Sequence, residues 1–301
     1  MPEQTRRPRP TAALRAALAA GGPVLAPYAA DPLSTLLVQR LGFPAAYVGG
    51  GALGYVLATT EARLTSSDVV TIVRGITAVC NLPLIVDVAT GFGDPIHVER
   101  TVRELERAGA AGIEIEDQLT PKHAHHHKGI DHPISQEAMV EKVEAAVAAR
   151  DDPDFLIIAR TNTIAEVNLE EGIRRANAYA AAGADLILIF PRNEDEFRRL
   201  PREIAKPLAA MTIAVARPPR FTPARLAELG YPLVIEAQAG MLAAYAAVRR
   251  GYEQIQQQGY IEMDPEELRR HRAEMDELVG LPALWAVEER TTERPERLPR
   301  Q

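Results

Sequence analysis

The chain has 301 residues, 47% apolar and 25% charged, which is enough for one large α/β domain or two smaller ones. Its net charge of −7 and isoelectric point near 5.6 argue against nucleic acid or an acidic membrane surface as a partner, and favour small polar metabolites. No apolar run approaches the roughly 20 residues that a membrane span needs. The single cysteine, Cys80, excludes an internal disulfide and indicates a reducing compartment, which we take to be the cytoplasm.

The elements expected along the chain alternate between short and long segments. An arginine-containing tail and a first helix come first, because the alanine-rich stretch there is too short and too charged for a signal peptide. Short aliphatic runs then alternate with longer amphipathic segments, a pattern typical of βα units around a parallel sheet. The expected strands cover residues 23–28, 45–50, 82–89, 111–117, 154–161, 185–190, 207–213 and 231–237. The expected helices cover residues 32–41, 67–79, 95–108, 135–149, 169–182, 194–204, 222–229 and 240–258.

Eight strands, each followed by a helix, favour a closed (β/α)8 TIM barrel over a doubly wound open sheet. An open sheet would need a phosphate-binding glycine loop at its switch point, and residues 49–54 supply only a weak one. Residues 52–66 are expected to form a long, functional loop. A further helix is expected over residues 263–280, followed by a Pro- and Arg-rich tail. The predicted organisation is a barrel domain, residues 1–260, and a C-terminal helix and tail, residues 261–301. This C-terminal part is expected to pack on a neighbouring subunit, and for roughly the last ten residues a disordered tail is an equal alternative.

Charged residues end several of the expected strands, where a barrel places its active site. Asp87 and Glu116 end two neighbouring apolar strands, and a carboxylate there is costly unless it is paired or bound to a metal. Oxygen ligands completed by water suit Mg²⁺, whereas ion pairs with Lys122 or Arg160 are the alternative interpretation. Arg160 offers a planar fork suited to a substrate carboxylate or phosphate, or to an ordinary salt bridge.

A glycine run follows Tyr47 at the end of the second expected strand. The amides of Gly49, Gly50 and Gly51 can approach a substrate closely, because no Cβ intervenes. A simple turn explains the three glycines equally well.

Histidines are concentrated in the next loop. Residues 121–132 hold five of the seven, directly after the expected fourth strand. Histidine is both a common metal ligand and a group that titrates near neutral pH, so a zinc site, a solvated loop and an active-site lid are all compatible with this stretch. Because His125, His126 and His127 in a row cannot all face one ion in a regular element, we favour a lid that carries one or two working imidazoles.

Three stretches carry a family pattern: IVDVATGFGDPIHVERTVRELERAGAAGIEIEDQLTPKHAHHH, DPDFLIIARTN and GIRRANAYAAAGADLILI. They resemble the isocitrate lyase and phosphoenolpyruvate mutase superfamily, most nearly its methylisocitrate lyase and carboxyphosphonoenolpyruvate mutase branch, over residues 20–250. The resemblance implies a (β/α)8 barrel, a Mg²⁺ or Mn²⁺ ion at the strand ends and small 2-oxo or 2-hydroxy acids as substrates. It also implies a tetramer in which a C-terminal helix is exchanged between subunits.

The resemblance also implies roles for individual positions. Asp87 matches a metal-site aspartate, and Glu116 matches a ligand to metal-bound water. Arg160 matches a residue that binds the substrate's carboxylate. The other matches hold the carboxylate end of the substrate or open the gating loop: Tyr47, Gly49, Gly50 and Lys122.

The chain departs from the family pattern in ways that bear on chemistry. Ala124 stands where the lyases carry a cysteine acid, although Lys122 and His126 are retained, and Ala89 replaces a second metal-site aspartate. These changes imply weaker metal binding and an imidazole, from His125 or His126, as proton donor in place of the thiol. Other changed positions are Asn162, Phe190-Pro191, Met211 and Ile213, while Glu61 lies near the position of another water-holding aspartate.

The sequence therefore predicts a Mg²⁺-dependent lyase that cleaves a C–C bond in a small 2-hydroxy or 2-oxo dicarboxylic acid, by retro-aldol cleavage or decarboxylation through an enolate. Its predicted catalytic residues are Lys122, His125 and His126. The alternatives are phosphonomutase or phosphonopyruvate-hydrolase chemistry, which needs no lyase cysteine, and a non-catalytic barrel that binds an acid metabolite. We expect a homotetramer or homodimer with a small carboxylic acid as its substrate.

Overall fold

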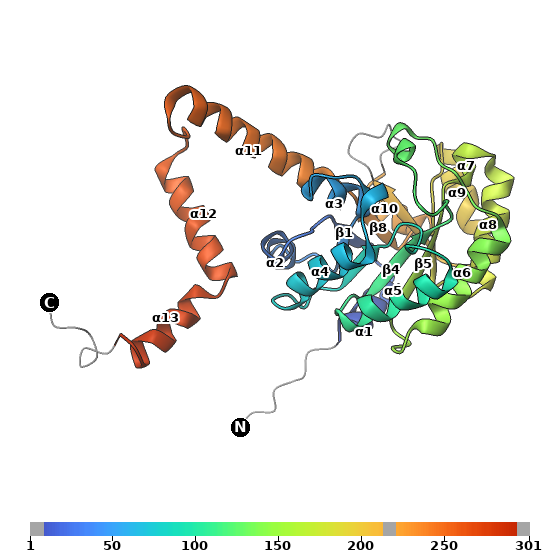
Figure 1. Cartoon of the computed structure of the whole chain (residues 1–301), viewed down its shortest axis with the longest axis horizontal. Coiled ribbons are helices and arrows are strands. Elements are labelled where there is room, and N and C mark those ends of the chain that lie inside the picture. Colours follow the sequence, from blue (N-terminus) through green and yellow to red (C-terminus); the bar gives the residue numbers. More distant parts are fainter. Residues whose placement is uncertain (1–8, 213–220, 294–301) are drawn as a thin grey trace. The chain divides into compact units, whose positions relative to one another are not determined.

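The structure is a computed structural model that describes residues 9–212 and 221–293 (Figure 1). Ile213, one of the changed family positions, lies outside the described residues. The chain forms two compact units, Met1–Leu242 and Ala243–Gln301. The domain boundary at residue 260 stays a prediction.

The first unit is built around eight parallel strands in the order β1-β8-β7-β6-β5-β4-β3-β2. A parallel bridge between Tyr28 and Tyr47 brings β1 beside β2, so the sheet nearly closes on itself. The predicted (β/α)8 barrel is therefore confirmed, and the open-sheet alternative is wrong. The strands are β1 (Val24–Pro27), β2 (Ala46–Val48), β3 (Leu84–Asp87), β4 (Gly112–Glu116), β5 (Leu156–Thr161), β6 (Leu186–Ile189), β7 (Leu208–Thr212) and β8 (Leu233–Glu236).

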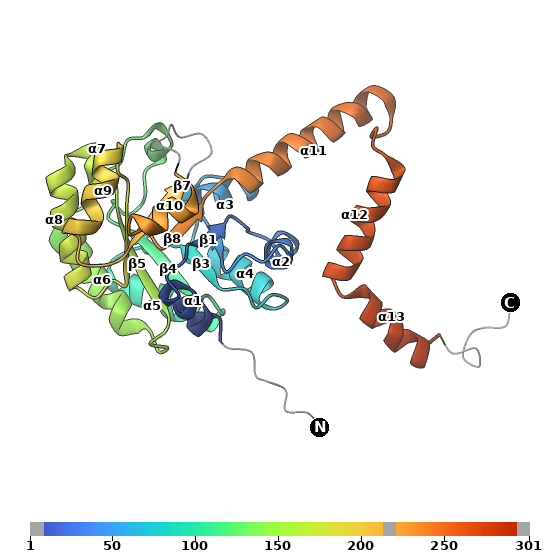
Figure 2. The ribbon, with the colours of Figure 1, turned by 180° about the vertical axis from the view of Figure 1, so that it is seen from behind.

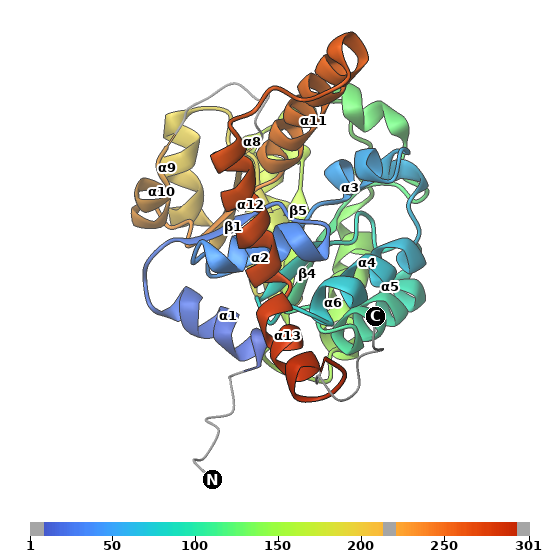
Figure 3. The ribbon, with the colours of Figure 1, turned by 90° about the vertical axis from the view of Figure 1, so that its left-hand side faces the viewer.

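Helices surround this barrel, as Figure 1 and the views from behind and from the side show (Figures 2 and 3). Every predicted helix is present, with ends within a few residues of the prediction. The α-helices are α1 (Pro10–Ala19), α2 (Pro32–Arg40), α3 (Gly50–Val56), α4 (Ser66–Thr77), α5 (Pro95–Arg107), α6 (Gln136–Ala149), α7 (Thr163–Glu166), α8 (Leu169–Ala181), α9 (Glu194–Glu203), α10 (Pro223–Glu228), α11 (Ala239–Gln258), α12 (Pro265–Leu278) and α13 (Leu281–Arg290). The 3-10 helices are η1 (Glu61–Arg63) and η2 (Ala124–Lys128).

Strand residues alternate between two apolar cores. One core fills the barrel interior and includes Ile85, Leu188 and Ala209. The other lies between the strands and the helices and includes Val86 and Ile115. Because side chains alternate along a strand, residues two positions apart share a face, and this parity decides which side chains point into the mouth of the barrel.

The prediction that residues 52–66 form a loop is wrong in its conformation, because α3 and η1 occupy part of the segment. Glycines lower the intrinsic helix propensity of α3, but Gly50, Ala52, Leu53 and Gly54 are buried, so tertiary packing holds the helix. The Pro- and Arg-rich tail also begins as a helix, α13, with Pro282 in the first turn, where the missing N–H is harmless.

The second unit contains the C-terminal part of α11 together with α12 and α13. Many of its large apolar side chains are exposed, Trp285 among them at 47%. Across the described ranges, no helix is both long and apolar enough to cross a membrane.

Candidate active site

Four buried carboxylates gather at the mouth of the barrel. Asp87 ends β3, Glu114 and Glu116 lie on β4, and Glu61 comes from η1; none is more than 6% exposed. We call these four residues the carboxylate cluster. Glu114 was missed by the sequence reasoning, although it lies two residues from Glu116 and therefore shares its face of the strand.

Asp87 is held by the main chain rather than by a cation. Its Oδ2 accepts a hydrogen bond of 3.0 Å from the Gly50 amide, and its Oδ1 accepts one of 2.8 Å from the Ala89 amide. Burial, and then the charges of Glu114 and Glu61, raise the pKa of Asp87 well above its usual value. No salt bridge to Asp87 occurs in the parts of the chain that the structure describes, so its charge is the least compensated of the cluster.

Glycine at position 50 lets η1 approach the site. A Cβ there would lie 2.8 Å from the Cγ atom of Glu61, closer than side chains tolerate. The Gly50 amide is already engaged by Asp87, so Gly50 shapes the site through that bond.

Arg160 and Tyr47 both hydrogen-bond to the carboxylate of Glu114. The Tyr47 hydroxyl donates a hydrogen bond of 2.6 Å to Glu114, and the Arg160 Nη1 lies 2.9 Å from the other carboxylate oxygen. The Arg160 Nε also lies 3.5 Å from Glu116, and its guanidinium carbon lies 5.1 Å from the centre of the Phe190 ring. Burial raises the pKa of Glu114, against the charge of Arg160. Arg160 therefore contacts the carboxylate cluster on one side and the Phe190 ring on the other.

Lys122 lies between two carboxylates. Its Nζ is 2.6 Å from Glu61 and forms an ion pair with Glu116. Burial disfavours the ammonium, but the charges of Glu116 and Glu61 outweigh it and raise the pKa of Lys122. The ion-pair interpretation therefore holds for Glu116 but not for Asp87, and Lys122 is a fixed cation rather than a base.

His126 is the loop imidazole that reaches the cluster. Its Nε2 lies 3.1 Å from Glu61, and its Nδ1 lies 2.8 Å from the main-chain oxygen of His123. Burial opposes ionisation of Glu61, but the hydrogen bond with His126 and the charge of Lys122 lower the pKa of Glu61 to about 2.

The other loop histidines do not converge with His126 on one point. The His127 ring nitrogen lies 2.7 Å from the Thr60 hydroxyl, and the His123 ring packs edge-on against His132. His125 is exposed, and its side chain makes no hydrogen bond, ion pair or ring contact within the described residues. Among those same residues, no group of three or more His, Cys, Asp or Glu is arranged to hold a metal. This finding disfavours the zinc interpretation, and it also means that the carboxylate cluster, in this arrangement, offers at most two of its side chains to one ion.

Asp117, next to Glu116, points away from the mouth and anchors the end of β4. Its Oδ2 accepts hydrogen bonds from Thr161 at 2.7 Å and Tyr179 at 2.8 Å, and Arg175 lies 3.2 Å away. Burial raises the pKa of Asp117. We therefore regard it as support for the strand ends rather than as part of the site.

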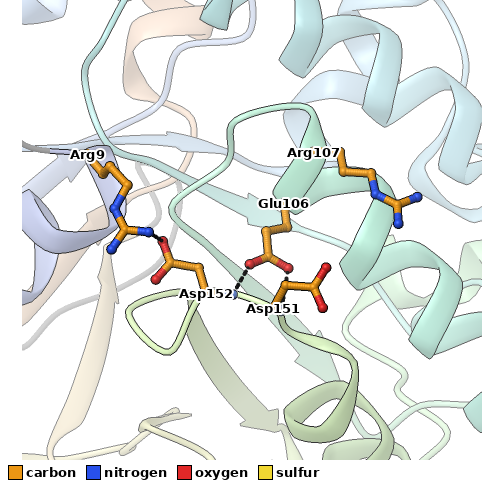
Figure 4. A pocket seen from close by; sticks show the side chains of 5 residues that line it. All are labelled: Arg9, Glu106, Arg107, Asp151 and Asp152. Carbon is orange, nitrogen blue, oxygen red and sulfur yellow. Dashed lines mark hydrogen bonds and ion pairs between the residues drawn. The ribbon is translucent and has the colours of Figure 1, made fainter.

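A shallow surface pocket of about 300 Å³ lies far from this chemistry (Figure 4). Its lining residues precede α1, β4 and β5, so they belong to the amino ends of the strands, the face that stabilises a barrel. Arg9 pairs with Asp152 at 3.0 Å, and Glu106 accepts the amides of Asp151 and Asp152. These groups are thus ion-paired or hydrogen-bonded with one another, and Arg107 is the remaining residue that lines the pocket.

Comparisons with known proteins agree with this fold. The phosphoenolpyruvate phosphomutase family model matches residues 14–256. A 2-methylisocitrate lyase from Aeropyrum pernix is 40% identical over 83% of this chain and 81% of that protein. A 2,3-dimethylmalate lyase from Eubacterium barkeri is 37% identical over 75% of this chain and 78% of that protein.

A solved structure extends the likeness to the whole fold. Phosphonopyruvate hydrolase, in complex with oxalate and Mg²⁺, superposes with a TM-score of 0.81 at 32% identity, covering 95% of this chain and all of that one. The chain therefore belongs to the phosphoenolpyruvate mutase/isocitrate lyase superfamily, in which its curated relatives from Aeropyrum pernix and Eubacterium barkeri are named lyases.

Proposed function

We propose that the protein cleaves a C–C bond in a small 2-hydroxy or 2-oxo dicarboxylic acid, by retro-aldol cleavage or decarboxylation, with an enolate as the leaving fragment. The observation that carries the proposal is the buried carboxylate cluster with Lys122, Arg160 and His126 around it. Its charged groups can bind an acid, stabilise negative charge and deliver a proton. Curated relatives named for the cleavage of 2-methylisocitrate and 2,3-dimethylmalate support this reaction type.

The cluster fits Mg²⁺ by charge and by ligand type. Four carboxylates surround two permanent cations, and burial, followed by the charges of Glu114 and Glu61, raises the pKa of Asp87. A cation bound beside Asp87 would offset both effects. Mg²⁺ is commonly held by one or two carboxylates, with water and substrate oxygens completing the shell. We propose Asp87 as the direct ligand and Glu116 as its partner, for Mg²⁺ or Mn²⁺. When bound, the metal supplies Lewis-acid stabilisation of the enolate oxygen.

Arg160 is the proposed binder of the substrate's carboxylate. Its guanidinium fork matches a carboxylate with two parallel hydrogen bonds, and Glu114 holds it in place. The wall of the proposed substrate site next to Arg160 is formed by Tyr47, Gly49 and Gly50. The Tyr47 hydroxyl orients Glu114 through its hydrogen bond. Lys122 adds a second positive charge close to the reacting atoms, which favours negative charge that develops as the bond breaks.

His126 is the proposed proton donor to the departing enolate. Histidine is the side chain that proteins use most often as a general acid, and the His126 Nε2 lies 3.1 Å from the carboxylate of Glu61. His125 is the weaker choice, because its exposed ring has no partner within the described residues to aim it at the site. This assignment supplies a proton donor in place of the cysteine that the lyases carry at the position of Ala124.

Proton NMR of the protein with Mg²⁺ and four acids tests the proposal: oxaloacetate, 2-methylisocitrate, 2,3-dimethylmalate and phosphonopyruvate. We expect cleavage of at least one of the three carboxylic acids, loss of activity with EDTA, and a fall of about 100-fold or more in Asp87→Asn. Asp195→Asn, on the exposed side of α9, is the matched control. Turnover of phosphonopyruvate alone, or full activity in Asp87→Asn, would contradict the proposal.

A further inference from the structure

Gln118 is a buried amide that lies between two carboxylates. It comes two residues after the end of β4 and is 3% exposed. Its Nε2 donates a hydrogen bond of 2.9 Å to Glu116 Oε2 and one of 2.8 Å to Asp131 Oδ1. Because carboxylate oxygens accept hydrogen bonds, the amide has to present its nitrogen to both acids, which fixes the rotation of the Gln118 side chain. Both N–H groups of the amide are therefore in use.

Gln118 is also the nearest described partner of that Glu116 oxygen. The Asn162 Nδ2 lies 3.4 Å from Oε2, and the Arg160 Nε lies 3.5 Å from it, whereas Lys122 pairs with the other oxygen, Oε1. An N–H···O hydrogen bond is strongest near 2.9 Å and weak at these longer distances. The orientation of Oε2 therefore depends mainly on Gln118.

Asp131 comes from the far end of the loop between β4 and α6. Its side chain is partly buried, and burial, followed by the charge of Glu116, raises its pKa. Among the residues that the structure describes, no cation forms an ion pair with Asp131, and the Gln118 amide is the donor to its side chain. A hydrogen-bond donor shared between two carboxylates stabilises the charged form of each. Gln118 thus joins the two acids rather than serving Glu116 alone.

The ends of this loop are held together by the main chain as well. The Leu119 amide donates to the His132 oxygen at 2.9 Å, and the Ile134 amide donates to the Asp117 oxygen at 2.8 Å. Neither bond uses the side chain of Asp131. A substitution there can therefore remove the contact with the amide while the two ends of the loop stay paired.

We propose that Gln118 and Asp131 are positioning residues for the metal site. Asp131 holds the Gln118 amide, and the amide holds the carboxylate of Glu116 in the orientation that binds Mg²⁺. This inference rests on the proposed function, which makes Glu116 the partner of Asp87 at the metal. Removing a group that hydrogen-bonds to a metal ligand typically weakens metal binding by about 10- to 100-fold. The far end of the loop thereby contributes to the affinity of a site that it does not touch.

Calorimetric titration with Mg²⁺, without substrate, tests the role of Asp131. Asp131→Ala removes both the charge and the hydrogen bond, whereas Asp131→Asn removes the charge alone, because its amide oxygen can accept the same bond. We expect the Mg²⁺ dissociation constant to rise about tenfold in Asp131→Ala and to stay within about twofold of the native value in Asp131→Asn. Glu166→Gln is the control for charge, because exposed Glu166 accepts the Asp131 main-chain amide at 3.3 Å, and it should also stay within about twofold.

A double-mutant cycle tests whether Asp131 acts through Gln118. Gln118→Met keeps the length of the side chain and removes both donors, so it should raise the dissociation constant about tenfold or more. Gln118→Met/Asp131→Ala should bind Mg²⁺ no more weakly than Gln118→Met alone, because both substitutions break the same chain of hydrogen bonds. The melting temperature of each variant shows that it is folded.

Four results would overturn the inference: unchanged affinity in Asp131→Ala, an equal loss in Asp131→Asn, losses that multiply in the double variant, or no binding of Mg²⁺ to the native protein. Because the titration contains no substrate, it is independent of the reaction. The expected affinities in a protein that cleaves none of the acids would reject the lyase reaction alone. Cleavage by a protein whose Mg²⁺ affinity is the same in Asp131→Ala would reject the positioning role alone.

Discussion

Single residues set the charge of the active site. Among the residues that the structure describes, no cation forms an ion pair with Asp87, and Ala89, two residues on, lacks the carboxylate that the family pattern carries there. Ala89 also has a φ of 49°, in the left-handed region that Asn and Asp adopt more readily than alanine. The backbone at this position is therefore suited to the residue that is missing.

Restoring that carboxylate should strengthen metal binding. We expect Ala89→Asp to lower the Mg²⁺ dissociation constant about tenfold relative to Ala89→Asn, because both fit the backbone and only the former adds a charged oxygen ligand. Calorimetric titration with Mg²⁺ measures both variants. Equal affinities in the Asp and Asn variants would show that position 89 does not face the metal.

Glu61 should make stability depend on pH. Its folded pKa of about 2 lies below the ordinary value of 4.5, so its contribution is fully present above the unfolded pKa and is lost as the pH falls towards 2. The difference in unfolding free energy between the native protein and Glu61→Gln should therefore shrink by roughly 1 to 2 kcal/mol between about pH 7 and about pH 3.5. Urea unfolding at both pH values measures this. A difference that stays constant or grows on acidification would argue against ionised Glu61 in the folded protein.

The loop between β4 and α6 is anchored near its first residues by Lys142 of α6. Lys142 of α6 donates a hydrogen bond of 2.9 Å to the Thr90 oxygen, and its Nζ also lies 3.4 Å from the Thr120 hydroxyl, which in turn donates to the Thr90 hydroxyl at 2.7 Å. This buried lysine thus ties the loop after β3, which carries Ala89, to the loop that carries Lys122. Burial lowers the pKa of Lys142.

Removing this tie should destabilise the barrel. Lys142→Met should lower the unfolding free energy by about 1 to 3 kcal/mol, because the buried Thr90 oxygen would lose its partner. Lys128→Met, at the exposed end of η2, is the matched control and should change it by less than about 0.5 kcal/mol. Urea unfolding at neutral pH compares them, and equal effects of the two substitutions would remove the proposed role of Lys142.

The elements were predictable where the sequence is periodic. Aliphatic runs such as residues 82–87 could be placed because a parallel strand is buried on both faces. The short helix α3 could not be placed from the sequence, because its glycines disfavour a helix. The burial of Leu53 that stabilises α3 depends on tertiary packing, which has no local sequence signal. The same division applies to the site. Asp87, Glu116 and Arg160 were identified because they lie at strand ends, whereas the contact of His126 with Glu61 joins two 3-10 helices 65 positions apart and has no local signal.

For the molecule as a whole, the exposed apolar side chains of the second unit point to self-association. Leu284 and Trp285 of α13 are 56% and 47% exposed, and large exposed apolar surfaces usually mark interaction sites. We propose that α12 and α13 bind a second copy of the chain in a homodimer or homotetramer. The cytoplasmic location stays a prediction.

Light scattering during gel filtration tests the assembly. We expect a mass that is two or four times 32.8 kDa, and a shift towards 32.8 kDa in Trp285→Glu, because a charge in an apolar interface is costly. Glu289→Gln, on the same helix, should leave the mass unchanged. A native mass of 32.8 kDa would contradict the proposed assembly.

The assignment of His126 is tested most directly by comparing His126→Ala with His125→Ala, on the acid that the native protein cleaves with Mg²⁺. We expect kcat to fall by about 100-fold or more in His126→Ala, the usual contribution of a general acid, and to change by less than about twofold in His125→Ala. An equal loss in both variants, or full activity in His126→Ala, would contradict proton delivery by the imidazole that Glu61 holds at the mouth of the barrel.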